Sequence, residues 1–166
     1  MASRQTKASG RRLHWAVALS ILAALATGYA LTNTEGFSLT LLRAHLVFGA
    51  TAGLLALLRV VLRILKGPPA PVFQAVTRLQ MRAAGLVHWA LRLIPLALFV
   101  SGAGMIAISG LLPSVADGTL TGLSRLEALP PRALHHAAAL VLALLIGLHA
   151  LAALWHGLRR PAAGPA

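Results

Sequence analysis

The chain has 166 residues, enough for one domain, and 58% of them are hydrophobic while only 11% are charged. A soluble domain is about half apolar and a quarter charged, so this composition predicts an integral membrane protein. Cysteine is absent, which excludes disulfides, thiolate metal sites and thioether-linked cofactors, and the net charge of +12 does not indicate nucleic-acid binding because the basic residues punctuate long apolar runs.

Four stretches are long enough to cross a bilayer as helices, which needs about 20 apolar residues. In chain order they are about Leu13–Thr32, Leu41–Leu65, Ala83–Leu112 and Ala133–Leu158. None has the alternating pattern of a strand, and the first is too long for a signal-peptide core and lacks a clear cleavage site, so we expect it to be retained. The sequence therefore predicts an all-α, integral membrane four-helix bundle.

Basic residues gather on one side of the predicted membrane. Eleven of the 15 Lys and Arg residues lie in the N-terminal tail, around the connection between the second and third spans, or at the C-terminus. The other side has three arginines together with all three acidic residues. The positive-inside rule then places both termini in the cytoplasm, with residues 1–12 as a basic tail, residues 13–158 as the four-helix domain and residues 159–166 as a second tail. The aromatic belt expected at the inner membrane surface is formed by Trp15, Trp89 and Trp155.

All seven histidines lie in these spans or at their ends. They are His14, His45, His88, His135, His136, His149 and His156. Polar side chains inside a membrane are costly and usually face the bundle interior, often at a functional site. Hydrogen bonding between helices would be a sufficient explanation for any one of them. The spacing of the set indicates something more specific.

His135 and His149 lie about four helical turns apart on the last span. In a helix their directions differ by only about 40° while their heights differ by about 21 Å. His136 points about 140° away from His149, so we expect that it does not bind the same kind of centre. Two rings on one face, separated by most of a bilayer, favour two stacked metal centres. Haem suits this arrangement because it needs one ring on each side of the iron, whereas zinc normally gathers three or four ligands at one depth.

Each centre then needs a partner ring at matching depth on another helix. His45 begins the second span on the outer side, which is the depth of His135. His14 begins the first span on the inner side. From depth alone it could pair with His149 or with His156, which lies about two helical turns further along the last span.

Several motifs make the chain similar to a known family. They are "RRLHW" (11–15), "HLVFG" (45–49) followed by "RVVLR" (59–63), His88 in the third span, and "HHAAALVLALLIGLHALAALWH" (135–156). Four histidine positions on four helices in this order, with the 14-residue step, resemble the bacterial cytochrome b561 family. The resemblance covers most of the chain, from about Arg11 to about Arg159.

The resemblance implies a multi-pass protein of the bacterial cytoplasmic (inner) membrane that transfers electrons through two non-covalent b haems. It implies His45 and His135 as ligands of the outer haem, and His14 and His149 as ligands of the inner one. Electrons would pass to or from the quinone pool, in one version with superoxide as donor, which would make the chain an oxidoreductase. The alternative is a haem b anchor subunit of a hydrogenase, dehydrogenase or reductase complex. The expected partners are lipid, quinone and a redox protein, and not nucleic acid.

Further polar residues have two interpretations each. Arg59 and Arg63 share a helix face near the inner surface, either as positive-inside anchors or as partners of haem propionates. Similar candidates on the outer side are Arg43 and Arg132. His88 and His156 lie near the inner haem and are candidates for a quinone or proton site, because histidine exchanges protons near neutral pH.

The third span departs from the family pattern. The family usually has a tyrosine one helical turn after the third-span histidine, and a proline about two turns further on. These places hold Arg92 and Phe99, while Pro95 is displaced. We therefore expect this helix to bend at a different place. The family pattern then gives no position for a substrate site on this helix.

Overall fold

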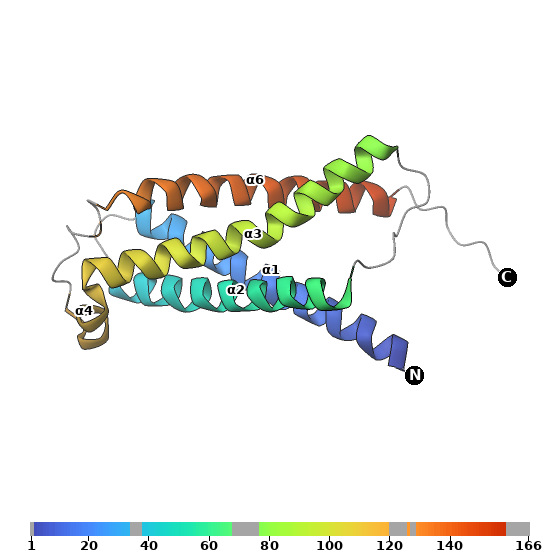
Figure 1. The fold of residues 1–166 in the computed structure, drawn as a ribbon. Coiled ribbons are helices and arrows are strands. Elements are labelled where there is room, and N and C mark those ends of the chain that lie inside the picture. Colours follow the sequence, from blue (N-terminus) through green and yellow to red (C-terminus); the bar gives the residue numbers. More distant parts are fainter. Residues whose placement is uncertain (1, 34–37, 68–76, 120–125, 127–128, 159–166) are drawn as a thin grey trace.

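The structure is a computed structural model that describes residues 2–33, 38–67, 77–119, 126 and 129–158, with side chains from residue 9 onward. Every regular element in these ranges is a helix. In chain order the helices are α1 (Ala2–Asn33), α2 (Leu39–Lys66), α3 (Arg78–Ser109), α4 (Leu111–Asp117) and α6 (Pro131–Leu158) (Figure 1). Four of them, α1, α2, α3 and α6, are long and apolar enough to span a membrane. The predicted all-α four-helix architecture is confirmed.

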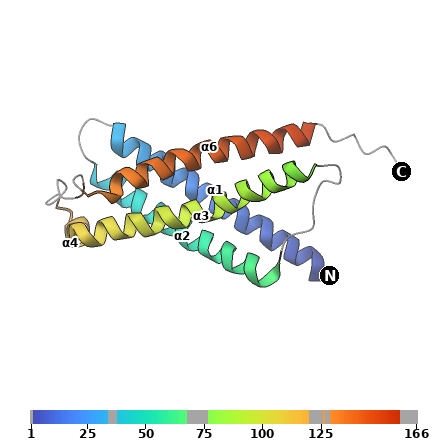
Figure 2. The same ribbon diagram turned by 45° about the horizontal axis from the view of Figure 1, so that its top comes forward.

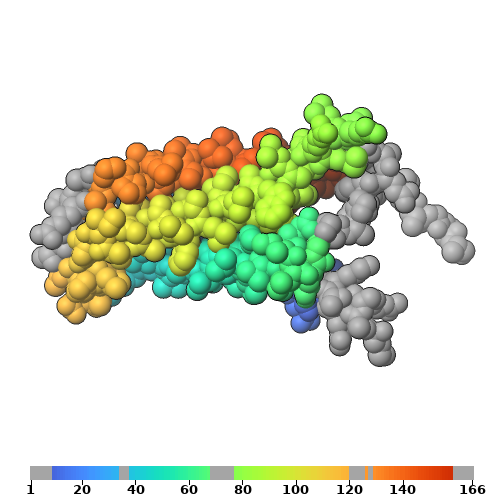
Figure 3. Space-filling view, viewed as in Figure 1, coloured from blue at the N-terminus to red at the C-terminus, as the bar shows by residue number. Residues whose placement is uncertain are grey.

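The four long helices run lengthwise and alternate in direction (Figures 1 and 2). The start of α1, the end of α2, the start of α3 and the end of α6 lie at one end of the bundle, and α4 lies at the other (Figure 1). Following the sidedness expected from the basic residues, the α4 end is termed the outer end and the opposite one the inner end. The space-filling view shows α2, α3 and α6 side by side along one face of this elongated body (Figure 3).

The helix boundaries differ from the predicted spans. The N-terminal tail expected over residues 1–12 is helical from Ala2 onward, as a continuation of α1. The third span was predicted to reach Leu112, but α3 ends at Ser109. Gly110 adopts the left-handed conformation with φ 66°, which a residue without a side chain tolerates best, and the chain turns there into the short helix α4.

Side chains satisfy the open backbone groups at several helix ends. Ser38 accepts a hydrogen bond from the first turn of α2, and Thr77 forms a capping box with Gln80 at the start of α3. At the end of α4, the guanidinium of Arg43 on α2 donates to the carbonyl oxygens of Val115 and Ala116. Arg43 therefore ties α4 to α2 across the outer end.

The larger of two buried apolar clusters lies between the two levels of histidines, and the other joins α2 to α4 at the outer end. The buried members of the larger cluster are Val17 and Ile21 of α1, Ala52 of α2 and Leu142 of α6. Many large apolar side chains on the outside of the bundle are exposed, for example Leu144, at 71%. This distribution is the one expected for helices whose outer faces meet lipid.

Close helix packing is uneven around the bundle. α1 packs on α2, α2 on α3, and α3 on α6, but α6 has no comparable close packing with α1 or α2 among the described residues. Where α2 and α3 meet, a Cβ added to Gly53 would overlap the side chain of Phe99. Phe99 thus makes a tight contact between α2 and α3, while Pro95, inside α3, is buried.

Candidate functional site

His45 of α2 and His135 of α6 face each other at the outer level. Their ring centres are 6.3 Å apart and their planes are inclined by 72°. His135 follows Pro131 by one helical turn and His45 follows Leu39 by less than two turns, so each ring lies just inside the outer end. His136, the neighbour of His135, has an exposed side chain at the rim of the same region.

Each ring of this outer pair is held through Nδ1 by a neighbouring helix. Nδ1 of His45 is 2.9 Å from the carbonyl oxygen of Ala24 on α1, which only accepts, so Nδ1–H donates to it. Nδ1 of His135 is 2.8 Å from Oγ of Ser101 on α3. Ser101 itself donates to the carbonyl of Leu98, so its oxygen accepts from His135. Both rings therefore keep the lone pair of Nε2 available for a metal, in the tautomer that ligating histidines usually adopt.

A cavity of about 660 Å³ surrounds the outer pair. It is lined by residues of all four long helices, among them His45, His135, Arg132, Gly28, Gly49 and Gly102. Two of these glycines lie against the rings: an added Cβ would be 2.9 Å from Cε1 of His45 at Gly28, and 3.3 Å from Cε1 of His135 at Gly102. The absence of side chains here leaves room for the rings and for a large flat ligand beside them.

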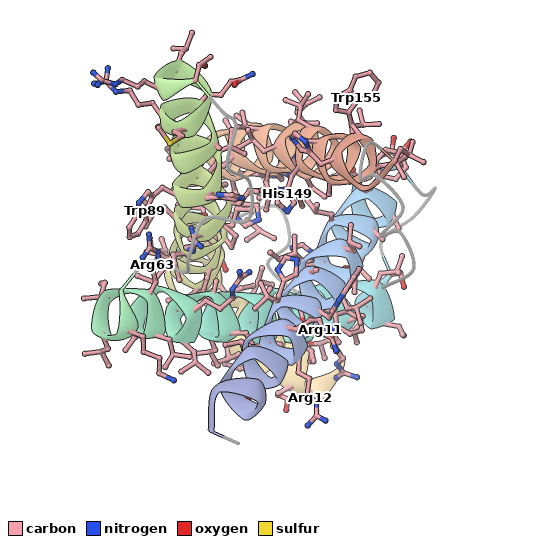
Figure 4. All side chains as sticks on the ribbon, turned by 90° about the vertical axis from the view of Figure 1, so that its right-hand side faces the viewer. Arg11, Arg12, Arg63, Trp89, His149 and Trp155 are labelled. Carbon is pink, nitrogen blue, oxygen red and sulfur yellow. The ribbon has the colours of Figure 1, made fainter. Side chains whose placement is uncertain are left out.

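His14 of α1 and His149 of α6 face each other at the inner level. Their ring centres are again 6.3 Å apart, with planes inclined by 79°. His149 points from α6 into the space between the helices (Figure 4). His88 of α3 has its ring centre 5.5 Å from that of His149, and Nη1 of Arg59 donates to Nδ1 of His14 at 3.1 Å.

The ring spacing can be compared with that of two histidines that share a metal. Two imidazoles on opposite sides of one metal ion have centres about 6.4 Å apart, since a metal–nitrogen bond is about 2.0 Å and the ring centre lies about 1.2 Å behind the nitrogen. The pairs His45–His135 and His14–His149 both have this spacing. The spacing of His88 and His149 is too short for two rings on opposite sides of one metal ion.

Helix lengths explain why His14 meets His149 rather than His156. His14 lies about five helical turns before the outer end of α1, at Asn33, and His149 lies the same number of turns after the outer end of α6, at Pro131. Both are therefore about 27–29 Å from the outer ends. His156 lies about 10 Å further along α6, on its last turn. Depth estimated from the sequence left both partners open, because α6 begins two residues earlier than predicted and α1 extends past His14.

The other expected site residues are spread between the two levels. Arg132 borders the outer cavity, whereas Arg43 is engaged with α4. Of the inner arginines, Arg59 contacts His14, while Arg63 lies beside Trp89 between α2 and α3 (Figure 4).

The groups that support the outer rings were not predicted from the sequence. They are Ser101, Ala24, Gly28 and Gly102. The only signal in the sequence was the hydroxyl of Ser101 and the two glycines inside apolar runs, while Ala24 acts through its backbone carbonyl and gave none.

Comparison with protein families gives a match that covers nearly the whole chain. The family model for prokaryotic cytochrome b561 matches residues 6–163. The chain belongs to the prokaryotic cytochrome b561 family. No curated protein and no solved structure gives a significant match.

Membership of the cytochrome b561 family establishes the general role of the chain. It is a multi-pass cytochrome of the bacterial inner membrane, and it transfers electrons across that membrane by means of haem b. The residues present fit this cofactor. Two imidazole pairs have the spacing of axial ligands, α6 is not closely packed against α1 or α2 in the described ranges, and glycines line the outer rings. Haem supplies reversible one-electron chemistry at iron, while the protein sets its ligation and surroundings.

Proposed function

We propose that this cytochrome b561 holds two b haems and passes electrons between them across the membrane. The observation that carries the proposal is the repetition of one geometry: two imidazole pairs, each 6.3 Å apart. The pairs share α6, where His135 and His149 are about 21 Å apart along the helix axis. His45 and His135 would hold the outer haem, and His14 and His149 the inner one.

Each of the two outer rings is held by a hydrogen bond through Nδ1. Ala24 and Ser101 fix the rings of His45 and His135 with Nε2 directed away from the hydrogen-bonded side. Such partners orient a ligand and increase its basicity. Arg132, at the edge of the cavity, is the residue we assign to an outer propionate.

The inner residues require one rearrangement. Arg59 donates to Nδ1 of His14, so that nitrogen carries no proton in this arrangement. A histidine that binds iron through Nε2 carries its proton on Nδ1, so Arg59 must turn away from His14 when haem binds. The freed guanidinium would then pair with an inner propionate, and this is the role we assign to Arg59.

We further propose that the inner haem exchanges electrons with quinone, with His88 supplying or accepting the proton. Quinone reduction consumes protons, and His88 combines an exposed side chain with direct contact to His149. His156, further out on α6, is the second candidate for proton exchange with the inner surface. The superoxide version has less support, because Arg43 is engaged with α4 and only Arg132 remains as a cation lining the outer cavity in the part of the chain that the structure describes.

The number of haems is the direct test. Protein purified in detergent should contain about two haems per chain with a low-spin b-type spectrum, extractable by acid acetone because the chain has no cysteine to tether them. One haem per chain would contradict the two-centre proposal. Copurification with an iron–sulfur subunit would instead indicate the anchor role in a larger complex, with the same two centres.

A further inference from the structure

A group of three arginines lies at the inner end without a carboxylate partner among the described residues. Arg59 and Arg63 of α2 are both within electrostatic range of Arg92 of α3. The chain has only three acidic residues, and none lies between positions 36 and 116. Asp117, the only one of the three within the described ranges, ends α4 at the outer end. Three like charges at the edge of an apolar bundle repel one another, so an anion from outside the polypeptide would stabilise them.

Arg63 and Arg92 lie on neighbouring packed helices, and among the described residues neither donates to a histidine ring as Arg59 does. Arg59 uses Nη1 on the ring of His14, in the interior. Arg63 has a buried Nε atom with no hydrogen-bond partner among the described residues. Arg92 donates from Nη1 to the carbonyl of His88, one turn earlier on its own helix, and its guanidinium lies 5.7 Å from the ring centre of Trp89. Arg63 and Trp89 lie on the α2–α3 side of the bundle, away from His149 in the centre (Figure 4).

Arg63 lies at the depth of the lipid headgroups, whereas the backbone of Arg92 lies deeper and its side chain extends toward them, to the carbonyl of His88. Arg63 lies about 36 Å along α2 from the outer end of that helix at Leu39, and Arg92 lies about 26 Å along α3 from its outer end at Ser109. These distances lie on either side of a hydrocarbon thickness of about 30 Å. Trp89, one turn from Arg92, is of the residue type enriched at this level. Lipid phosphates lie immediately outside the hydrocarbon.

Exposed apolar side chains flank the two arginines on the same helices. Ile64 and Leu65 of α2 are 68% and 75% exposed, and Leu93 of α3 is 49% exposed. These surfaces suit acyl chains, while the guanidiniums suit a group with several anionic oxygens. A soluble anion would bind the guanidiniums but would leave the apolar side chains uncovered.

We propose that Arg63 and Arg92 bind the phosphate of an anionic phospholipid at the inner end, between α2 and α3. The phosphate accepts from the guanidiniums, including the unsatisfied Nε of Arg63, and offsets their charge. Basic pockets between membrane helices are typical sites for anionic headgroups. The rival occupant is a propionate of the inner haem, for which Arg59 is better placed because it already contacts His14.

The test uses the whole chain, purified in mild detergent, with retained phospholipid and haem both quantified by mass spectrometry and absorption. The variant is Arg63→Gln/Arg92→Gln, and the matched control is Arg78→Gln/Arg82→Gln, which removes two exposed charges from the first turns of α3. We expect the variant to retain about tenfold less anionic phospholipid, the factor that corresponds to about 1.4 kcal/mol. Haem content should equal that of the wild type in both proteins, and the control should keep its lipid.

Three results would overturn the proposal. Loss of the inner haem from the variant, with lipid retained, would assign the pair to a propionate. Equal lipid loss from the control would mean diffuse attraction to the basic end. A measurement on the wild-type protein tests the site even if the variant does not fold. In native mass spectrometry, added phosphatidylglycerol should stay bound to the wild type at collision energies that remove phosphatidylcholine. Equal retention of the two lipids would also contradict the site.

Discussion

Oγ of Ser101 on α3 lies 2.8 Å from Nδ1 of His135 on α6. The same hydroxyl donates to the carbonyl of Leu98, so its proton is committed to its own helix and its lone pair is directed at the imidazole. A residue that touches no metal thus fixes the orientation and the tautomer of a proposed ligand.

Replacing Ser101 with Ala should raise the midpoint potential of the outer haem. Without an acceptor for Nδ1–H, His135 becomes a weaker electron donor and stabilises the oxidised iron less well. The hydrogen bond is stronger when the iron is oxidised, and each 1 kcal/mol of that difference corresponds to about 40 mV for a one-electron couple. Redox titration followed by absorption measures the shift. Ser109→Ala is the control, because Ser109 makes the same type of bond within α3, to Ile106, and should leave both potentials unchanged.

His135→Ala should remove the outer haem, whereas His136→Ala should leave both haems in place. The ring that faces His45 belongs to His135, while His136 is exposed at the rim of the cavity. Haem content and the low-spin spectrum of each variant check the prediction. If the two substitutions exchanged their effects, the ligand assignment on α6 would be wrong.

Gly28→Ala should weaken binding of the outer haem without any change to a ligand. The added Cβ would lie 2.9 Å from Cε1 of His45, so the imidazole must move. Displacing the support of a metal ligand typically costs about tenfold or more in affinity. Gly104→Ala on α3 is the matched control, since a Cβ there meets no atom within 4 Å. The haem content of the two purified proteins should differ, and equal content would show that the space beside His45 is not limiting.

The sequence predicted the parts of this architecture that depend on one helix at a time. Long uninterrupted apolar runs located all four spans, and helical periodicity placed His135 and His149 on one face. The contacts that support the proposed ligands could not be predicted from the sequence because they join distant parts of the chain. Ser101 and His135 are 34 residues apart, and Arg43 and Val115 are 72 apart. Which helices become neighbours is decided by packing, and the role of Arg43 further depends on the chain turning at Gly110.

The last prediction separates the two histidines at the inner end of α6. His149→Ala should remove the inner haem, because it leaves His14 without the ring that faces it at 6.3 Å. His156→Ala should keep both haems, since His156 lies about 10 Å further along the helix. If His156 supplies protons for quinone chemistry, its loss should slow reoxidation by an added quinone while the spectra stay unchanged. Absorption spectra and stopped-flow reoxidation of the two single variants make the comparison. A His156→Ala protein without its inner haem, beside a His149→Ala protein that keeps it, would reverse the assignment and would mean that α1 and α6 slide past each other by two helical turns when haem binds.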